Sequence, residues 1–169
     1  MRSALGREFN MRAGASQRAV VRNLATRLRA LNPRTNAQVS LVGFATGALH
    51  ALDRAAQLNF DDARAKPSAT EFGKEFKKVL AAISRGRGRP NAWLAGFYLH
   101  SAMLRLAAVN ERLNKLLRTR DDRVRSVRRA VNSLKHHVDA HISGKRTVLY
   151  AEVLRAAEIV CQRLEGAVP

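Results

Sequence analysis

The chain has 169 residues, which is enough for one domain with a hydrophobic core that needs no covalent support. It carries 31 lysines and arginines against 13 acidic residues, and the resulting net charge of +18 indicates a polyanionic partner, either a nucleic acid or an anionic membrane surface. The single cysteine, Cys161, excludes an intrachain disulfide framework and a cysteine-based zinc module.

The first 34 residues are rich in arginine and contain one acidic residue, Glu8. We expect residues 1–34 to form a basic arm, with an amphipathic helix from Ser16 to about Leu31 whose apolar stripe is Val20, Leu24, Leu28 and Leu31. An organelle transit peptide has a similar composition, but we favour a basic arm on a cytoplasmic protein. Residues 35–169 are then expected to form a helical bundle domain.

The next predicted helix, Asn36 to Leu58, includes the longest uncharged stretch of the chain, Thr35 to Leu52. Its apolar part is shorter than the roughly 20 residues that a membrane span needs, so we predict a buried helix and no membrane partner. Apolar side chains cover much of its circumference, which indicates a central position. The expected core residues are Val42, Ala45, Leu49, Leu52 and Ala56.

Ser68 and Glu71 have the spacing of a capping box, which predicts a third helix with the stripe Phe72, Phe76, Val79, Leu80 and Ile83. A basic, glycine-broken loop follows at residues 84–89. Its arginines, Arg85, Arg87 and Arg89, lead into Pro90, and the RGRP sequence resembles the core of an AT-hook, which enters the minor groove of A·T-rich DNA. We favour an ordinary basic connector over an AT-hook, and a loop whose arginines contact the phosphates of RNA or DNA is compatible with that interpretation.

Three further helices are predicted. One begins at Pro90 or Asn91 and reaches about Arg118, with core residues Trp93, Leu94, Phe97, Leu104, Ala108 and Leu116. The next begins at Asp121 or Asp122 and reaches Ile142, with the seam Val124, Val127, Val131, Leu134 and Val138. The last, about Thr147 to Glu165, carries Leu149, Val153, Leu154, Ala157, Val160 and Leu164, and we expect Cys161 in the core. These patterns predict an all-α antiparallel helical bundle of five to six helices.

Arg129, Asn132 and His136 share one side of the penultimate helix, because Arg129 and His136 are almost two full turns apart. The apolar seam of that helix lies roughly opposite. The three side chains are therefore expected to face solvent, a cleft or a partner. An ordinary solvated polar face is the alternative interpretation.

From about Val39 onward the chain resembles the HEPN family of all-helical domains found in prokaryotic toxins and defence ribonucleases. The resemblance rests on the helix GFYLHSAMLRLAAVNERLNKLL, the helix RRAVNSLKHHVDAH and the closing amphipathic helix. The family motif is an arginine, four to six residues and a histidine, and Arg129 and His136 meet its upper limit. Ala130 departs from the pattern, because a polar residue usually follows the arginine.

The resemblance implies metal-independent RNA cleavage without a cofactor. His136 would act as general acid or base, Arg129 would stabilise charge on the phosphate, and Asn132 would orient the phosphate or His136. In the family two such helices usually meet across a dimer cleft.

Basic residues are concentrated between Arg105 and Arg129, a segment that contains nine basic and three acidic residues. Together with the loop arginines they are predicted to bind nucleic acid along a phosphate track. Its members are Arg112, Lys115, Arg118, Arg120, Arg123, Arg125 and Arg128. Most aromatic residues fall on core stripes, so base stacking is not expected.

His137 and His141 have a spacing that can chelate zinc from one helix, with Asp139 or His136 nearby. We expect no metal site, because His141 also continues the apolar seam. The predicted function is nucleic-acid binding, to RNA rather than DNA, with metal-independent endoribonuclease activity as a hypothesis. A homodimer and a protein partner, such as an antitoxin or assembly subunit, fit this prediction.

The alternatives are a non-catalytic binding or scaffold subunit of a phage, defence or ribonucleoprotein assembly, and a helical interaction protein. In the second case the arginine content would reflect a GC-rich genome.

Overall fold

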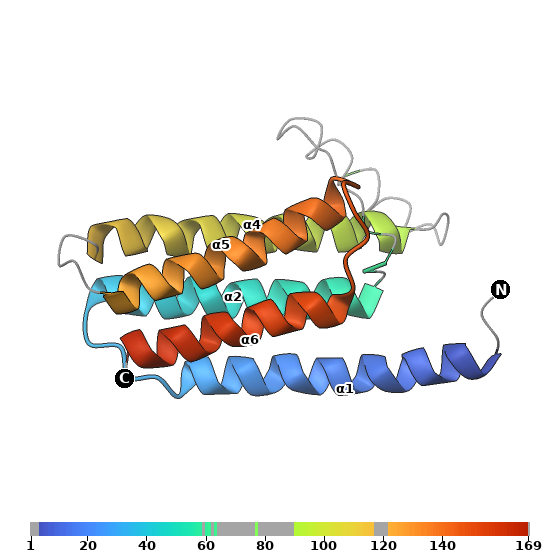
Figure 1. Ribbon diagram of the computed structural model, residues 1–169, viewed down its shortest axis with the longest axis horizontal. Coiled ribbons are helices and arrows are strands. Elements are labelled where there is room, and N and C mark those ends of the chain that lie inside the picture. The colour runs from blue at the N-terminus through green and yellow to red at the C-terminus, as the bar shows by residue number, and fades with distance from the viewer. Residues whose placement is uncertain are drawn as a thin grey trace.

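The computed structural model describes residues 4–58, 60, 61, 63, 77, 90–116 and 122–168, and the side chains of residues 17–58, 60, 61, 63, 77, 94–115 and 122–168. These residues form helices and no strand (Figure 1). The helices are α1 (Ala4–Arg29), α2 (Asn36–Leu58), α4 (Pro90–Leu116), α5 (Asp122–Ile142) and α6 (Tyr150–Ala167). The predicted all-α bundle is confirmed. The predicted helix at residues 68–83 and the loop at residues 84–89 lie outside the described residues, apart from the exposed, helical Lys77.

Each described helix runs antiparallel to the one before it, and their long axes are roughly aligned (Figure 1). The most extensive packing joins α2 to α4, and α5 packs mainly on α6. The helix α1 covers α2 and α6 on the outside of the bundle. One continuous core of leucine, valine and alanine therefore runs through all five of these helices.

The beginning of α2 is fixed by a reciprocal cap. Gln38 N–H donates to Thr35 Oγ1 over 3.2 Å, and the backbone N–H groups of Arg34 and Thr35 donate to Gln38 Oε1 over 2.8 and 3.4 Å. Such a capping box satisfies N–H groups that have no partner inside the helix. At the other end of the bundle Gly144, with φ of 73°, provides the left-handed residue of the turn after α5.

The sequence prediction is confirmed most fully for α5 and α6. The whole α5 seam is buried: Val124, Val127, Val131, Leu134 and Val138. Ala45, Leu49 and Leu52 of α2 are buried as predicted, while Val42 and Ala56 are partly buried at its edge. On α6 Cys161 lies in the core together with most of the predicted stripe.

The predicted stripes of α1 and α4 are partly wrong. The buried side of α1 is Val21, Leu24, Ala25 and Leu28, whereas Val20 is 37% exposed and Leu31 is only partly buried. Leu104 of α4 is 60% exposed, and Leu94, Phe97 and Ala108 are partly exposed. The buried side of α4 is instead Ala95, Leu99, Ala102, Leu106, Val109 and Leu113. Alanines alternate with leucines on this buried side, so small side chains contribute to the packing as much as large ones.

The predicted core position of Leu149 is also wrong, because this side chain is 60% exposed. Leu149 precedes α6, and its extended backbone turns the side chain out of the helical register. The buried residue at this end of the helix is Tyr150, whose hydroxyl donates to the Leu52 carbonyl over 3.3 Å.

Polar contacts attach α1 to the bundle. Arg18 Nε lies 3.6 Å from Asp53 Oδ1 on α2, and Arg27 forms an ion pair with Glu165 on α6. The hydrogen bond to the Glu165 carboxylate raises the pKa of Arg27. Together with Val21, Leu24 and Leu28, these contacts place the C-terminal half of α1 within the same core as the other helices.

Two buried groups should make the protein less stable at alkaline pH. Burial raises the pKa of the Cys161 thiol from 9.0 to about 12 and also raises the pKa of the Tyr150 hydroxyl. Above about pH 9 the unfolded chain therefore binds fewer protons than the folded chain, and the free energy of unfolding falls as pH rises. Urea unfolding of the wild type between about pH 8 and about pH 11 should show this decline. The free energy of unfolding should fall less steeply with pH in Cys161→Ala and in Tyr150→Phe.

The native thiol should also resist Ellman's reagent at about pH 8 and react once the chain is unfolded in urea. Rapid reaction of the folded protein would contradict the buried position of Cys161.

Candidate nucleic-acid interface

Four polar side chains form a row along the outside of α5. Arg125, Arg129, Asn132 and His136 follow one another at spacings of four, three and four residues, so they share one side of the helix. All four are exposed, and the buried valine seam occupies the opposite side. The structure thus places the predicted Arg129, Asn132 and His136 on one outward face, as their spacing predicts. We call these four residues the α5 row.

Asn132 is held in place by the neighbouring helix. Asn110 Nδ2 on α4 donates to Asn132 Oδ1 over 2.7 Å. One turn away on each helix, Arg128 donates to Asn114 Oδ1. These two contacts fix the antiparallel register of α4 and α5. Since Asn132 uses its oxygen in this contact, its amide N–H groups remain directed to an incoming acceptor.

Two buried polar atoms belong to the same α4–α5 contact. Asn110 Oδ1 and Arg128 Nε are shielded from solvent and have no hydrogen-bond partner among the described residues. A buried acceptor and a buried donor without partners are unfavourable unless water or a ligand satisfies them.

The three predicted catalytic residues share a face but do not converge within one chain. No hydrogen bond joins Arg129, Asn132 and His136 to one another in the part of the chain that the structure describes. The ring of His136 instead meets that of His137 edge-on, with 6.4 Å between centroids. A site in which these groups act together would need a second surface to close over them.

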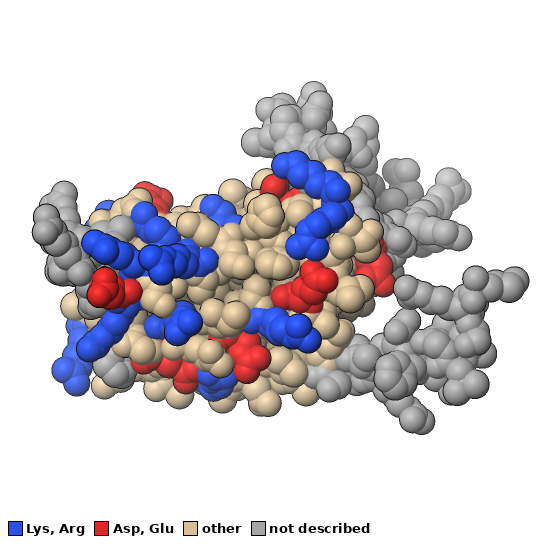
Figure 2. All heavy atoms as spheres, in the orientation of Figure 1, with Lys and Arg blue, Asp and Glu red and all other residues tan. Residues whose placement is uncertain are grey.

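The predicted phosphate track is divided between two sides of α4. Arg105 and Arg112 are seven residues apart and lie on the side of α4 near α2. Arg123, Arg125, Arg128 and Arg129 belong to α5, on the opposite side of α4. Figure 2 shows Lys and Arg side chains gathered where α4 ends and α5 begins. Of the remaining predicted residues, Lys115 is exposed, and Arg85, Arg87, Arg89, Arg118 and Arg120 lie outside the described residues.

The arginines of α5 differ in their contacts with acidic side chains. Arg125 Nη1 lies 3.7 Å from Asp122 Oδ1, and both side chains are well exposed, so this pair contributes little to stability. Arg128 contacts the neutral side chain of Asn114, which leaves its charge available. Arg129 has no ion pair with any described residue. A cationic surface of this kind favours a polyanion.

Three histidines of α5 have separate contacts among the described residues. His141 is fully buried; its Nε2–H donates to the Phe60 carbonyl over 2.6 Å, and its ring stacks on Phe60 at 4.2 Å. His137 Nδ1 contacts the Ser133 carbonyl over 2.7 Å, and Asp139 faces Lys145 at 4.0 Å. Among the described residues no group of three potential metal ligands comes together. His141 therefore has the packed, hydrogen-bonded role that its place in the seam suggested.

Asn110 and Asn114 were missed by sequence reasoning. Two asparagines four residues apart lie on the same side of a helix, and this spacing is a signal for a polar contact along that side. Their partners, Asn132 and Arg128, follow only from the register of α4 against α5.

Comparison with known families, curated proteins and solved structures gives no match to this chain. Among the described helices, none combines the length and apolar character needed to cross a membrane.

Proposed function

We propose that this protein binds nucleic acid, RNA in preference to DNA, through the α5 row and the cations beside it. The observation that carries the proposal is the position of Arg125, Arg129, Asn132 and His136 on one exposed face, backed by a fully buried seam. The arginine side chains present planar N–H donors that match phosphate oxygens. Asn132 adds a neutral donor at a position fixed by Asn110.

The geometry favours recognition of the backbone over recognition of bases. Eleven residues separate the ends of the row, so it extends about 16 Å along α5, which is long enough to follow several phosphates. The row contains no phenylalanine, tyrosine or tryptophan on which bases could stack. Binding of this kind is tolerant of sequence and strongly dependent on salt.

The double variant R125Q/R129Q should weaken RNA binding, because it removes two charges from the row without touching the core. We expect at least a tenfold rise in Kd by fluorescence anisotropy at low salt, since each arginine–phosphate contact is worth on the order of 1.5 kcal/mol. The slope of log Kd against log salt should also decrease by about 2, because about two phosphate contacts are lost.

The control is K145Q, which removes one exposed cation in the turn after α5. Its Kd should stay close to that of the wild type. Equal weakening by K145Q would show that net charge alone attracts RNA. Binding that ignores salt would favour a helical interaction protein with no nucleic-acid partner.

Metal-independent, HEPN-like endoribonuclease activity is the second candidate. It is supported by Arg129 and His136 on the same exposed face and by the anchored Asn132 between them. Imidazole titrates near neutrality and can move a proton at the ribose hydroxyl, while a guanidinium can stabilise charge on the phosphate. Because the three groups face outward, the cleft would form between two copies of α5. A cytoplasmic role in a toxin or defence system fits this candidate.

Purified protein incubated with structured and unstructured RNA in EDTA tests this candidate directly. The wild type should cleave RNA, and H136A should lose about two orders of magnitude or more in rate while still binding RNA. H50A, which removes an exposed histidine on α2, is the control and should retain the wild-type rate. Absence of cleavage by the wild type, or equal cleavage by H136A, would leave the non-catalytic subunit of a larger assembly as the function.

A further inference from the structure

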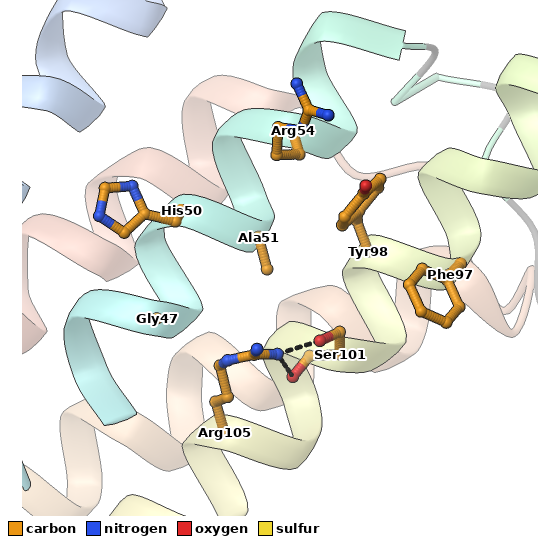
Figure 3. Close-up of a pocket in the computed structure, with 8 residues that line it drawn as sticks. All are labelled: Gly47, His50, Ala51, Arg54, Phe97, Tyr98, Ser101 and Arg105. Atoms are coloured by element: carbon orange, nitrogen blue, oxygen red, sulfur yellow. Dashed lines mark hydrogen bonds between the residues drawn. The ribbon is translucent and has the colours of Figure 1, made fainter. Parts of the chain in front are cut away.

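A hollow lies between α2 and α4, on the side of α4 away from α5. Its volume is about 400 Å³. Gly47, His50 and Arg54 border it from α2, and Tyr98 and Arg105 border it from α4 (Figure 3). Pockets of this size accommodate small organic ligands. Neither the α5 row nor its neighbouring cations take part in it.

The register of the two helices creates the hollow. Arg105 lies opposite Gly47, and Arg54 lies opposite Tyr98. Between these two pairs the hollow is lined by the small side chain of Ala51. A methyl group at position 47 would lie 2.8 Å from Arg105 Nε and 2.9 Å from its Cδ. Glycine at this position is therefore what allows Arg105 to lie across α2. Glycine inside a helix is less favourable than alanine, so Gly47 lowers the stability of α2 while it provides this space.

The two guanidinium groups are held at opposite ends of the hollow. Arg105 Nη1 donates to the Ser101 hydroxyl and lies 3.4 Å from the Ser101 carbonyl oxygen. Arg54 lies over the Tyr98 ring at 5.6 Å, and its Nη1 is 3.5 Å from Gln57 Oε1. In both arginines these contacts occupy Nη1, so the donors on Nε and Nη2 remain for a ligand.

The lining has a single sign of charge. Arg54 and Arg105 are cationic, His50 stands at the rim, and none of the residues that border the hollow is acidic. Ser101 and Tyr98 add hydroxyl groups. Phe97, which is partly buried, provides an apolar wall beside these polar groups. The combination suits an anion that carries an organic part.

We infer that the α2–α4 hollow binds a small phosphorylated molecule, no larger than a mononucleotide, through the guanidinium groups of Arg54 and Arg105. A phosphate monoester accepts several hydrogen bonds and carries up to two negative charges, which matches two anchored guanidinium groups. The limited volume favours a small molecule over a nucleic-acid strand. This site is independent of the α5 row, so its test does not depend on RNA binding.

The test is isothermal titration calorimetry of the full chain with adenosine 5′-monophosphate, ribose 5-phosphate and adenosine. Both phosphorylated probes should bind, and adenosine should not. R105Q should weaken the binding of both phosphorylated probes about tenfold or more, because one charged contact to phosphate is lost.

The glycines of α2 provide a matched steric pair. G47A should displace the flexible Arg105 side chain and weaken both phosphorylated probes, whereas G43A adds the same methyl group where no atom lies within 4 Å. Both substitutions favour the helix, so their difference reports the Arg105 contact alone. Unfolding midpoints of both variants establish that the fold is retained, and R105Q provides the answer if G47A does not fold. R163Q, which removes an exposed cation on α6, should bind the probes as the wild type does.

The inference is overturned if neither phosphorylated probe binds at a concentration of about 10 mM, because a specific site should have a Kd below that value. It is equally overturned if adenosine binds as well as its monophosphate. Equal weakening by R105Q and R163Q would show that overall charge, and not this hollow, attracts the probes. The same conclusion follows if an RNA oligonucleotide binds and neither phosphorylated probe does.

Discussion

The close packing of α2 on α4 is the contact on which the rest of the structure depends. Both helices place alanines on their buried sides, Ala45 and Ala48 on α2 and Ala95 and Ala102 on α4. A side chain that ends in one methyl group lets two helix backbones approach closely, and close-packed interiors resist any shift. The register that results sets Arg105 against Gly47 and leaves the other side of α4 to receive α5.

The position of α4 between two partners separates two polar surfaces. Towards α5, Asn110 reaches Asn132 and so fixes one member of an exposed row of arginine, asparagine and histidine. Towards α2, Arg105 is fixed by Ser101 beside a hollow with a second arginine. Among the described residues, the basic side chains on the two sides of α4 therefore form surfaces of different shapes. An extended row suits a long polyanion, and a hollow between two helices suits a small one.

The bundle and the α5 row could be predicted from sequence because the apolar residues of α5 recur at spacings of three and four. Charged residues occupy the remaining positions, so only one side of the helix can be buried. The same reasoning was wrong for α4, because apolar residues cover most of its circumference. Leu104 is larger than Ala102, yet Ala102 is buried and Leu104 is exposed, since the space beside α2 suits a small side chain. The hollow and the contacts of Asn110 depend on the register between helices, and no local pattern contains that information.

The proposed function requires that nucleic acid contact the α5 row and not the basic surface in general. Photo-crosslinking of 4-thiouridine RNA to the full chain, with the adducts located by mass spectrometry, distinguishes these two cases. Adducts should be concentrated between Arg123 and His136 and at the C-terminal end of α4. Adducts confined to α1 or α6, or spread over basic residues in proportion to their exposure, would contradict it.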